Sequence, residues 1–329
     1  MGVTRGKDMI QRKKRLPRVF DYFVEEDQFA GGNTFCAGCP AELALRTVPK
    51  VMGKDIVMVG TPSCSAPVLH GQNLGSWHKL AYYACVMTGV ASSASGLARY
   101  YQRVGIDATV VCFTGDGDAN DVGFQPLSGA AERNEHVVYI CYDNEGYMNT
   151  GNQRSSSTPL GAATSTTPVG KSARGKRNLS KYLPLIIALH PVAYVATATL
   201  SNMEDYAKKL LKAKEKSKEG FAYIHVFSPC VVGSRIATDS AIEVCRMAVR
   251  TNYFPLWEME DASFRFTYNV AHPRPIQEYL QLSGKFSHFN EEDVERFQEA
   301  VNHRYTIVDS LCRSGGAFDI PSVQATVSR

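Results

Sequence analysis

Short segments rich in Val and Ile alternate with longer segments of mixed polarity along most of this chain. Five of the short segments predict strands, at Asp55–Gly60, Ala108–Thr114, Val137–Asp143, Val192–Thr199 and Phe221–Phe227. The segments around them predict helices at Pro40–Val51, Tyr82–Arg103, Gly123–Asn134 and Ser201–Glu219. This alternation is typical of an α/β fold with a mostly parallel, doubly wound sheet.

The C-terminal part follows a different pattern. Three prolines, Pro255, Pro273 and Pro275, interrupt the alternation, and a helix is predicted at Asn290–Leu311. We therefore divide the chain into a basic arm (1–28), an α/β domain (29–250) and a C-terminal extension (251–329) that we expect to contact other subunits. About 15 residues at the end are predicted to form a loose tail.

Composition narrows the function classes. A hydrophobic content of 44% and a charged content of 21% are ordinary for a globular protein, and a net charge of +4 is too small to indicate nucleic-acid binding. The basic residues of the arm are interpreted as solvated or as contacting a partner subunit. No apolar run is long enough to span a membrane, and no apolar segment of a signal peptide follows the arm, so we expect a cytoplasmic protein.

One segment carries most of the candidate chemistry. Residues 108–151 combine a strand, a Gly-Asp-Gly turn, a helix and a second strand. Asp116 ends the first strand and Asn144 ends the second, 28 residues later. A right-handed crossover brings both ends to the same edge of a sheet, where open α/β folds bind ligands. Oxygen-bearing side chains there suit Mg²⁺ bound to a diphosphate.

A long segment rich in Ser, Thr, Gly and Pro follows, at Asn152–Asn178. Such a stretch is either a flexible linker or a cover over an active site. Its position directly after a ligand-bearing strand end favours the cover.

Four of the nine cysteines form a second constellation. Cys36 and Cys39 stand just before a predicted helix, whose N-terminal amides favour a thiolate, while Cys64 and Cys230 each follow a strand. Four thiolates at one edge suit Zn²⁺ or an iron–sulfur cluster, and one close pair joined to two isolated cysteines favours [4Fe–4S]. The remaining five are interpreted as small core residues: Cys85, Cys112, Cys141, Cys245 and Cys312.

Together these motifs resemble the β subunit of pyruvate:ferredoxin oxidoreductase-type enzymes, the thiamine-diphosphate-dependent 2-oxoacid:acceptor oxidoreductases. The resemblance covers roughly residues 29–282 and is most specific in GDG, YDNEGYMNTGNQRSS, TSTTPVGK and YIHVFSPC. It implies the thiamine-diphosphate-binding fold of the diphosphate-type domain, followed by a C-terminal extension.

The resemblance also assigns roles to residues. It implies that Asp116, the Asn144 side chain and the Gly146 carbonyl bind Mg²⁺, and that Gly115 and Gly117 let the backbone approach the diphosphate. It adds Asp118 and Thr150 to the cofactor-binding residues and places Asn149 near the thiazolium and the substrate as the catalytic residue. Four cysteines match the ligands of a [4Fe–4S] cluster: Cys36, Cys39, Cys64 and Cys230.

The implied activity is the oxidative decarboxylation of a small 2-oxoacid, pyruvate with coenzyme A, with electrons passed through the cluster to ferredoxin. The carboxylate that activates the cofactor comes in this family from a separate pyrimidine-binding domain. We therefore expect an α subunit with that domain, together with γ and ferredoxin-like δ subunits or fused equivalents, and no nucleic acid or membrane partner.

The sequence departs from the family where substrate choice is made. Asp118 to Asp121 replace the GTYD of many pyruvate-type members, and His70 and His78 are interpreted as polar contacts. Oxalate without coenzyme A, or a branched 2-oxoacid, therefore remain alternatives within the family. A non-redox thiamine-dependent decarboxylase subunit, with structural or zinc-binding cysteines, is the alternative from another class.

Overall fold

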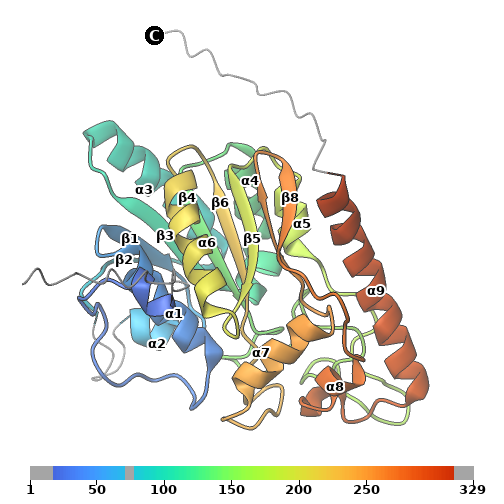
Figure 1. The fold of residues 1–329 in the computed structure, drawn as a ribbon. Coiled ribbons are helices and arrows are strands. Elements are labelled where there is room, and N and C mark those ends of the chain that lie inside the picture. The colour runs from blue at the N-terminus through green and yellow to red at the C-terminus, as the bar shows by residue number, and fades with distance from the viewer. Residues whose placement is uncertain (1–17, 71–77, 315–329) are drawn as a thin grey trace, which may run out of the picture.

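The computed structural model describes residues 18–70 and 78–314. Their eight strands form one sheet in the order β2-β1-β3-β4-β6-β5-β7-β8 (Figure 1). The strands are β1 (Ile56–Gly60), β2 (Ala81–Ala84), β3 (Thr109–Gly115), β4 (Val137–Asp143), β5 (Tyr194–Thr199), β6 (Ala222–Phe227), β7 (Leu256–Glu260) and β8 (Ser263–Tyr268). The first six are parallel, and β7 runs antiparallel to β5 and β8. The predicted α/β class with a mostly parallel sheet is confirmed.

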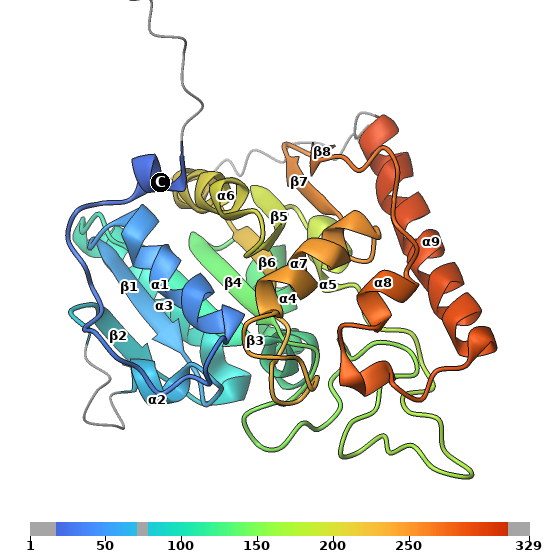
Figure 2. The same cartoon turned by 60° about the horizontal axis from the view of Figure 1, so that its bottom comes forward.

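Helices cover both faces of the sheet (Figure 2). One face carries α1 (Pro40–Met52), α6 (Met203–Lys216) and α7 (Ala241–Arg250), and the other carries α3 (Val90–Val104), α4 (Phe124–Glu132) and α5 (Leu183–Ala188). Side chains of a strand point alternately to the two faces. Accordingly, Val111 and Phe113 of β3 join the first core, whereas Val110 and Cys112 join the second. Doubly wound packing thus follows from the buried strands.

Three further α-helices lie in the described residues. The short α2 (Ala66–Leu69) follows β1, and α8 (Gln277–Leu280) precedes the long α9 (Glu291–Arg313), which packs beside β8 (Figure 1). The start of α9 is capped because the Asn290 side chain accepts a hydrogen bond from Asp293 N at 2.9 Å. The predicted helix Asn290–Leu311 is confirmed.

All five predicted strands are present within two residues of their predicted bounds. One helix prediction is wrong at its start, because Tyr82 to Ala84 belong to β2, which pairs in parallel with β1. The two tyrosines suit an extended edge strand, and Gly89 then separates this strand from α3, which begins at Val90.

The sequence pattern also missed the β7–β8 hairpin. Its turn is formed by Asp261 and Ala262, which both adopt positive φ angles, 50° and 58°. Two-residue hairpin turns with positive φ angles usually contain glycine, which makes them recognisable in a sequence. This turn contains no glycine. The sheet therefore continues past residue 250, while the functional division of the chain at that position stays a prediction. Most of the basic arm and the predicted tail lie outside the described residues.

Within residues 18–70 and 78–314, no helix is both long enough and apolar enough to cross a bilayer.

Candidate active site

Four neighbouring parallel strands end at one edge of the sheet. The registers Gly60↔Phe113, Gly115↔Tyr142 and Asp143↔Phe227 bring the ends of β1, β3, β4 and β6 to the same level. Cys64, Asp116, Asn144 and Cys230 all follow these ends within four residues. The prediction that the two motifs share one edge is therefore confirmed, and this edge is where such sheets bind ligands.

At this edge three acceptor oxygens face one another. The side-chain oxygen of Asn144 lies 2.8 Å from the carbonyl oxygen of Gly146 and 2.9 Å from Asp116 Oδ1. No donor lies among the three, unless the amide is turned by 180°. Adjacent ligands of an octahedral Mg²⁺, at metal–oxygen distances of about 2.0–2.1 Å, stand about 2.9 Å apart. The set has the composition and the spacing to hold such a cation.

Asp116 is fully buried, and burial raises its pKa well above the usual range, with the charge of Asp143 adding to the effect. Ser155 Oγ opposes this by donating to Asp116 Oδ2 at 2.5 Å, and Asn144 N donates to Oδ1 at 3.2 Å. A carboxylate in this position is stabilised in its charged form by a cation. The environment of Asp116 therefore fits a metal ligand.

Asp143, next to Asn144, differs from Asp116 because a side chain of the protein stabilises its negative charge. His225 Nε2 lies 2.8 Å from Asp143 Oδ2, and Tyr223 OH lies 2.7 Å from the other ring nitrogen. Burial alone would raise the pKa of Asp143, but the hydrogen bond and charge of His225 outweigh it and the pKa is lowered. Asp143 thus stays charged without any bound ion and fixes the end of β4.

A cavity of about 110 Å³ opens beside the oxygen set. It brings together Cys64 and seven of the residues predicted to bind the cofactor or substrate: Gly115, Gly117, Asp118, Asn144, Gly146, Asn149 and Thr150. Asp118 is 1% exposed, its Oδ1 has no hydrogen-bond partner, and burial raises its pKa to about 7. A water or a bound ligand in the cavity could supply a partner for this oxygen.

The two glycines of the Gly-Asp-Gly turn differ in what they permit. A Cβ on Gly117 would lie 2.5 Å from the Tyr147 ring, whose hydroxyl donates to the Gly117 carbonyl at 2.8 Å. A Cβ on Gly115 would lie 3.4 Å from Tyr142, at the limit of an ordinary contact. The structure therefore requires glycine at 117 for the packing of Tyr147, a reason that the sequence did not suggest.

The four predicted cysteine ligands are close enough to influence one another. Burial raises the pKa of Cys64 to about 12, with contributions from Cys230, Cys39, Asp116 and Cys36. Burial also raises the pKa of Cys39 to about 11, although the amides of Ala41 and Glu42 at the start of α1 lower it, as predicted for a helix N-terminus. Thiols with such pKa values ionise when a metal binds them.

The C-x-x-C turn packs against the loop that follows Cys230. A Cβ on Gly38 would lie 1.8 Å from the carbonyl oxygen of Thr238, so only glycine allows this approach, and its φ is +74°. Among the described residues, no three His, Cys, Asp or Glu side chains converge on a position for one metal ion. The choice between zinc and a cluster stays a prediction.

Asn144 connects the two constellations. Its side-chain nitrogen lies 3.9 Å from Cys64 Sγ, while its oxygen belongs to the acceptor set. A single amide can therefore direct its dipole toward a cation on one side and toward a thiolate on the other.

The Ser- and Thr-rich segment is anchored beside this edge. Thr158 Oγ1 donates to the Glu145 carbonyl at 2.7 Å, and Lys176, buried at 3% exposure, donates to the carbonyls of Ser156 and Thr158. Residues 151–182 contain no helix or strand in the structure. Whether the segment closes over a ligand stays a prediction.

Sequence reasoning missed several residues that support the site. Ser155 and Thr158 tie the acceptor set to the following loop, and the only signal was the run of hydroxyl residues after Gly151. His225 was visible as a polar residue inside an apolar strand. His70 and His78, predicted as polar contacts, flank the Tyr82 ring, and His78 Nε2 contacts the Leu69 carbonyl at 2.9 Å.

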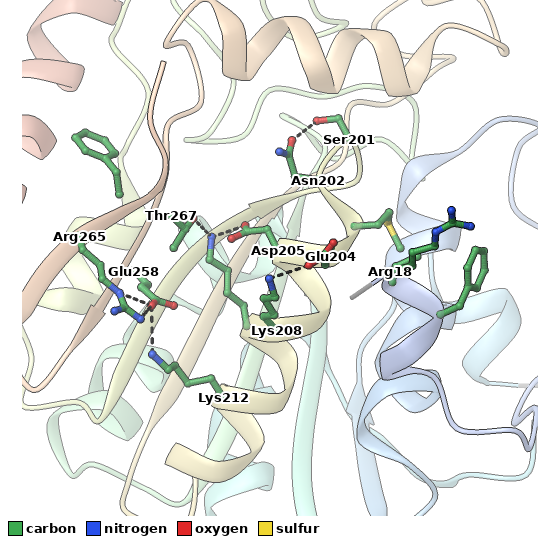
Figure 3. Close-up of a pocket in the computed structure, with 15 residues that line it drawn as sticks. Arg18, Ser201, Asn202, Glu204, Asp205, Lys208, Lys212, Glu258, Arg265 and Thr267 are labelled. Carbon is green, nitrogen blue, oxygen red and sulfur yellow. Dashed lines mark hydrogen bonds and ion pairs between the residues drawn. The ribbon is translucent and has the colours of Figure 1, made fainter. Parts of the chain in front are cut away.

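In the described part of the chain, a cavity of about 900 Å³ shares no lining residue with the one beside the oxygen set. It is lined by α6, β7, β8 and the segment around Arg18, and Figure 3 shows that its charged side chains face one another. Lys208 pairs with Glu204 at 2.8 Å, and Lys212 pairs with Glu258 at 3.2 Å. It contains none of the residues predicted to be functional, so size alone does not place the active site there.

Comparison with known proteins identifies the family of the domain that carries these residues. The family described as thiamine pyrophosphate enzyme, C-terminal TPP binding domain, matches residues 59–226. Pyruvate synthase subunit PorB of Methanothermobacter thermautotrophicus is 42% identical over 290 residues, which cover 88% of this chain and 97% of the relative. Ketoisovalerate oxidoreductase subunit VorB of Pyrococcus horikoshii is 41% identical over 315 residues, 92% of this chain and 98% of the relative.

The β subunit of the NADH-dependent phenylglyoxylate dehydrogenase of Aromatoleum evansii is 44% identical over 288 residues, 87% of this chain. The chain spans 65% of the length of that relative. A solved 2-oxoglutarate:ferredoxin oxidoreductase from Magnetococcus marinus matches with a TM-score of 0.51 and 21% identity, over 71% of this chain and 82% of that one. At this identity the structural match supports the fold alone.

Gly117→Ala is expected to lower the free energy of unfolding by about 1–3 kcal/mol, because the added methyl group must displace Tyr147. Gly96→Ala is the control, since Gly96 lies in α3 with no atom within 4 Å of an added Cβ. It should raise stability by about 0.5–1 kcal/mol through helix propensity. Urea unfolding of the purified protein measures both, and equal stability of Gly117→Ala and the wild type would contradict the packing argument.

Proposed function

This chain belongs to the thiamine pyrophosphate enzymes, among the β subunits of 2-oxoacid oxidoreductases. From that premise we propose that it binds the diphosphate half of thiamine diphosphate and takes part in the oxidative decarboxylation of a small 2-oxoacid. The observation that carries the proposal is the shared cavity. Cys64 lines the same space as Asp116's neighbours Gly115, Gly117 and Asn144. An electron acceptor ligated by Cys64 would thus stand next to the cofactor.

Magnesium is assigned to the acceptor set. The ion would be held by Asp116, the Asn144 side chain and the Gly146 carbonyl. Mg²⁺ would supply the positive charge that these acceptor oxygens lack. Gly115, Gly117, Asp118 and Thr150 line the cavity where the diphosphate would bind, and Asn149 lies at its exposed mouth, where the substrate would enter.

The four cysteines are assigned to a [4Fe–4S] cluster. Cys36 and Cys39 reach the edge from the start of α1, Cys64 from β1 and Cys230 from β6. Their mutual electrostatic influence supports a common site. When bound, thiamine diphosphate supplies the electron sink for decarboxylation, and the cluster removes the electrons.

The chain's own residues would bind and orient these groups and keep water away. Ser155 and Asn144 N hold Asp116, while His225 keeps Asp143 charged at the end of β4. The segment 152–178 is assigned as the closing element over the cavity, supported by its attachment to the site through Thr158.

The site needs partner subunits. The names of the relatives as subunits support an assembly of several chains. We assign the activating carboxylate to an α subunit with a pyrimidine-binding domain, and further clusters to γ and ferredoxin-like δ subunits or fused equivalents, with ferredoxin as the acceptor.

Pyruvate is the first candidate substrate. Pyruvate, coenzyme A and two oxidised ferredoxins would give acetyl-CoA, CO₂, a proton and two reduced ferredoxins. A branched 2-oxoacid is the second candidate, because the ketoisovalerate relative is as similar as the pyruvate relative, at 41% and 42% identity. Oxalate without coenzyme A follows, as the remaining alternative within the family.

A substrate screen of the purified native complex with a viologen dye tests this proposal. Pyruvate should reduce the dye only when coenzyme A is present, and the isolated chain should be inactive because it lacks the activating carboxylate. Turnover of 3-methyl-2-oxobutanoate, phenylglyoxylate or oxalate in place of pyruvate would replace the substrate. Turnover by the isolated chain would overturn the assignment of half an active site.

Metal analysis tests the cluster. Cys64→Ser and Cys230→Ser should each lower the iron and acid-labile sulfide of the complex by about four atoms per chain. Cys312→Ser, a half-buried cysteine in α9, should leave both unchanged. Zinc in place of iron, with no visible absorbance lost in either variant, would instead support the non-redox decarboxylase subunit.

A further inference from the structure

Glu145 stands between two of the three acceptor residues and has an unusual backbone. Its φ is +68°, in the left-handed region that side chains other than Gly, Asn and Asp rarely adopt. Such a conformation persists only where surrounding interactions hold it. Because Asn144 and Gly146 are joined to Glu145 by peptide bonds, their orientation depends on the interactions that hold Glu145.

Every polar group of Glu145 is engaged. Its amide donates to Asp143 Oδ1 at 2.9 Å, and its carbonyl accepts from Thr158 Oγ1 at 2.7 Å. Of its carboxylate oxygens, Oε1 accepts a hydrogen bond from Tyr253 OH and Oε2 forms an ion pair with Lys285 Nζ. The side chain is thus fixed from the C-terminal part of the chain, 140 residues away in sequence.

The ion pair is buried, with Glu145 at 3% and Lys285 at 4% exposure. A buried carboxylate that loses its cation is left uncompensated, so it is driven to move toward water. Such a movement releases the constraint on a strained residue. Movement of Glu145 would turn the two neighbours that supply acceptor oxygens.

Lys285 also lies near the other constellation. Burial raises the pKa of Cys230 and the amides of Gly233 and Val232 lower it, and the Lys285 ammonium lowers it as well. The main-chain carbonyl of Lys285 accepts from Ala163 N at 3.1 Å, in the Ser- and Thr-rich segment. One residue of the C-terminal segment therefore contacts or influences each of the three parts of the site.

We infer that Lys285 is a positioning residue that, by holding Glu145 in its left-handed conformation, keeps Asn144 and Gly146 aligned with Asp116 for cation binding. This inference rests on the proposed function only in identifying the ion as Mg²⁺. Lys285 itself touches none of the three acceptor oxygens; it acts through Glu145. Tyr253 assists from the other carboxylate oxygen.

The test compares Lys285→Met with Lys209→Met in the assembled complex. Lys209 is the control because it is also a buried lysine, 1% exposed, and pairs with Asp205 at 2.5 Å and Thr267 at 2.7 Å, both of which line the 900 Å³ cavity of Figure 3. Each complex is stripped of metal and titrated with Mg²⁺ at fixed thiamine diphosphate, and cofactor binding is followed by calorimetry. Thermal unfolding is measured in parallel.

Lys285→Met should raise the Mg²⁺ concentration for half-maximal cofactor binding by about tenfold or more. Lys209→Met should lower thermal stability but leave that concentration within about twofold, since it breaks an ion pair that contacts none of the site residues. With Mn²⁺ in place of Mg²⁺, the paramagnetic resonance spectrum of Lys285→Met should report an altered ligand geometry, and that of Lys209→Met should match the wild type.

Tyr253→Phe keeps the ring and removes one hydrogen bond to Glu145. It tests the same role by a milder change if Lys285→Met does not fold. It should raise the Mg²⁺ requirement by about threefold, in the same direction. Equal Mg²⁺ requirements in the wild type, Lys285→Met and Tyr253→Phe would overturn the positioning role while leaving the proposed function intact. A wild-type complex that binds no thiamine diphosphate at any Mg²⁺ concentration would overturn the proposed function and this inference with it.

Discussion

At the edge where β3 and β4 end, the side-chain oxygen of Asn144 lies within 3 Å of two other acceptor oxygens, Asp116 Oδ1 and the Gly146 carbonyl. Lone pairs at that distance repel, so the arrangement needs a positive charge or a donor among them. The parallel register of the sheet brings Asp116 and Asn144 together, and Ser155 and Thr158 fix the loop around them. The geometry of the site thus follows from satisfying this one set of oxygens.

Two other buried carboxylates near the set have cationic or hydrogen-bonding partners within the chain. Asp143 is balanced by His225, and Glu145 by Lys285. Buried pairs of this kind add little net stability, because desolvation offsets most of their attraction, but breaking one is costly. Their effect here is to fix the backbone between β4 and the next loop. Asp116 has no cationic side chain as a partner: its oxygens accept from Ser155 and from Asn144 N, and Oδ1 also faces the Asn144 side chain, which reaches on toward Cys64.

The sequence predicted the parts of this account that depend on local patterns. Val- and Ile-rich runs identified β1, β3, β4, β5 and β6, and the crossover rule then placed Asp116 and Asn144 at one edge. The β7–β8 hairpin was missed because Asp261 and Ala262 form its turn without glycine. The pair of Glu145 and Lys285 could not be found, since nothing in either local segment indicates a contact across 140 residues. The four cysteines were selected by their places at strand and helix ends and then matched to the family's cluster ligands, and their role stays a proposal.

The central claim is that Asp116 holds the cation through which thiamine diphosphate binds. The most direct measurement is the calorimetric affinity of the complex for thiamine diphosphate with and without Mg²⁺, in the wild type, Asp116→Asn and the exposed control Asp55→Asn. The account predicts Mg²⁺-dependent binding that Asp116→Asn weakens on the order of a hundredfold, through loss of the only carboxylate in the acceptor set, and that Asp55→Asn leaves unchanged. Binding that is independent of Mg²⁺, or unaffected by Asp116→Asn, would contradict it.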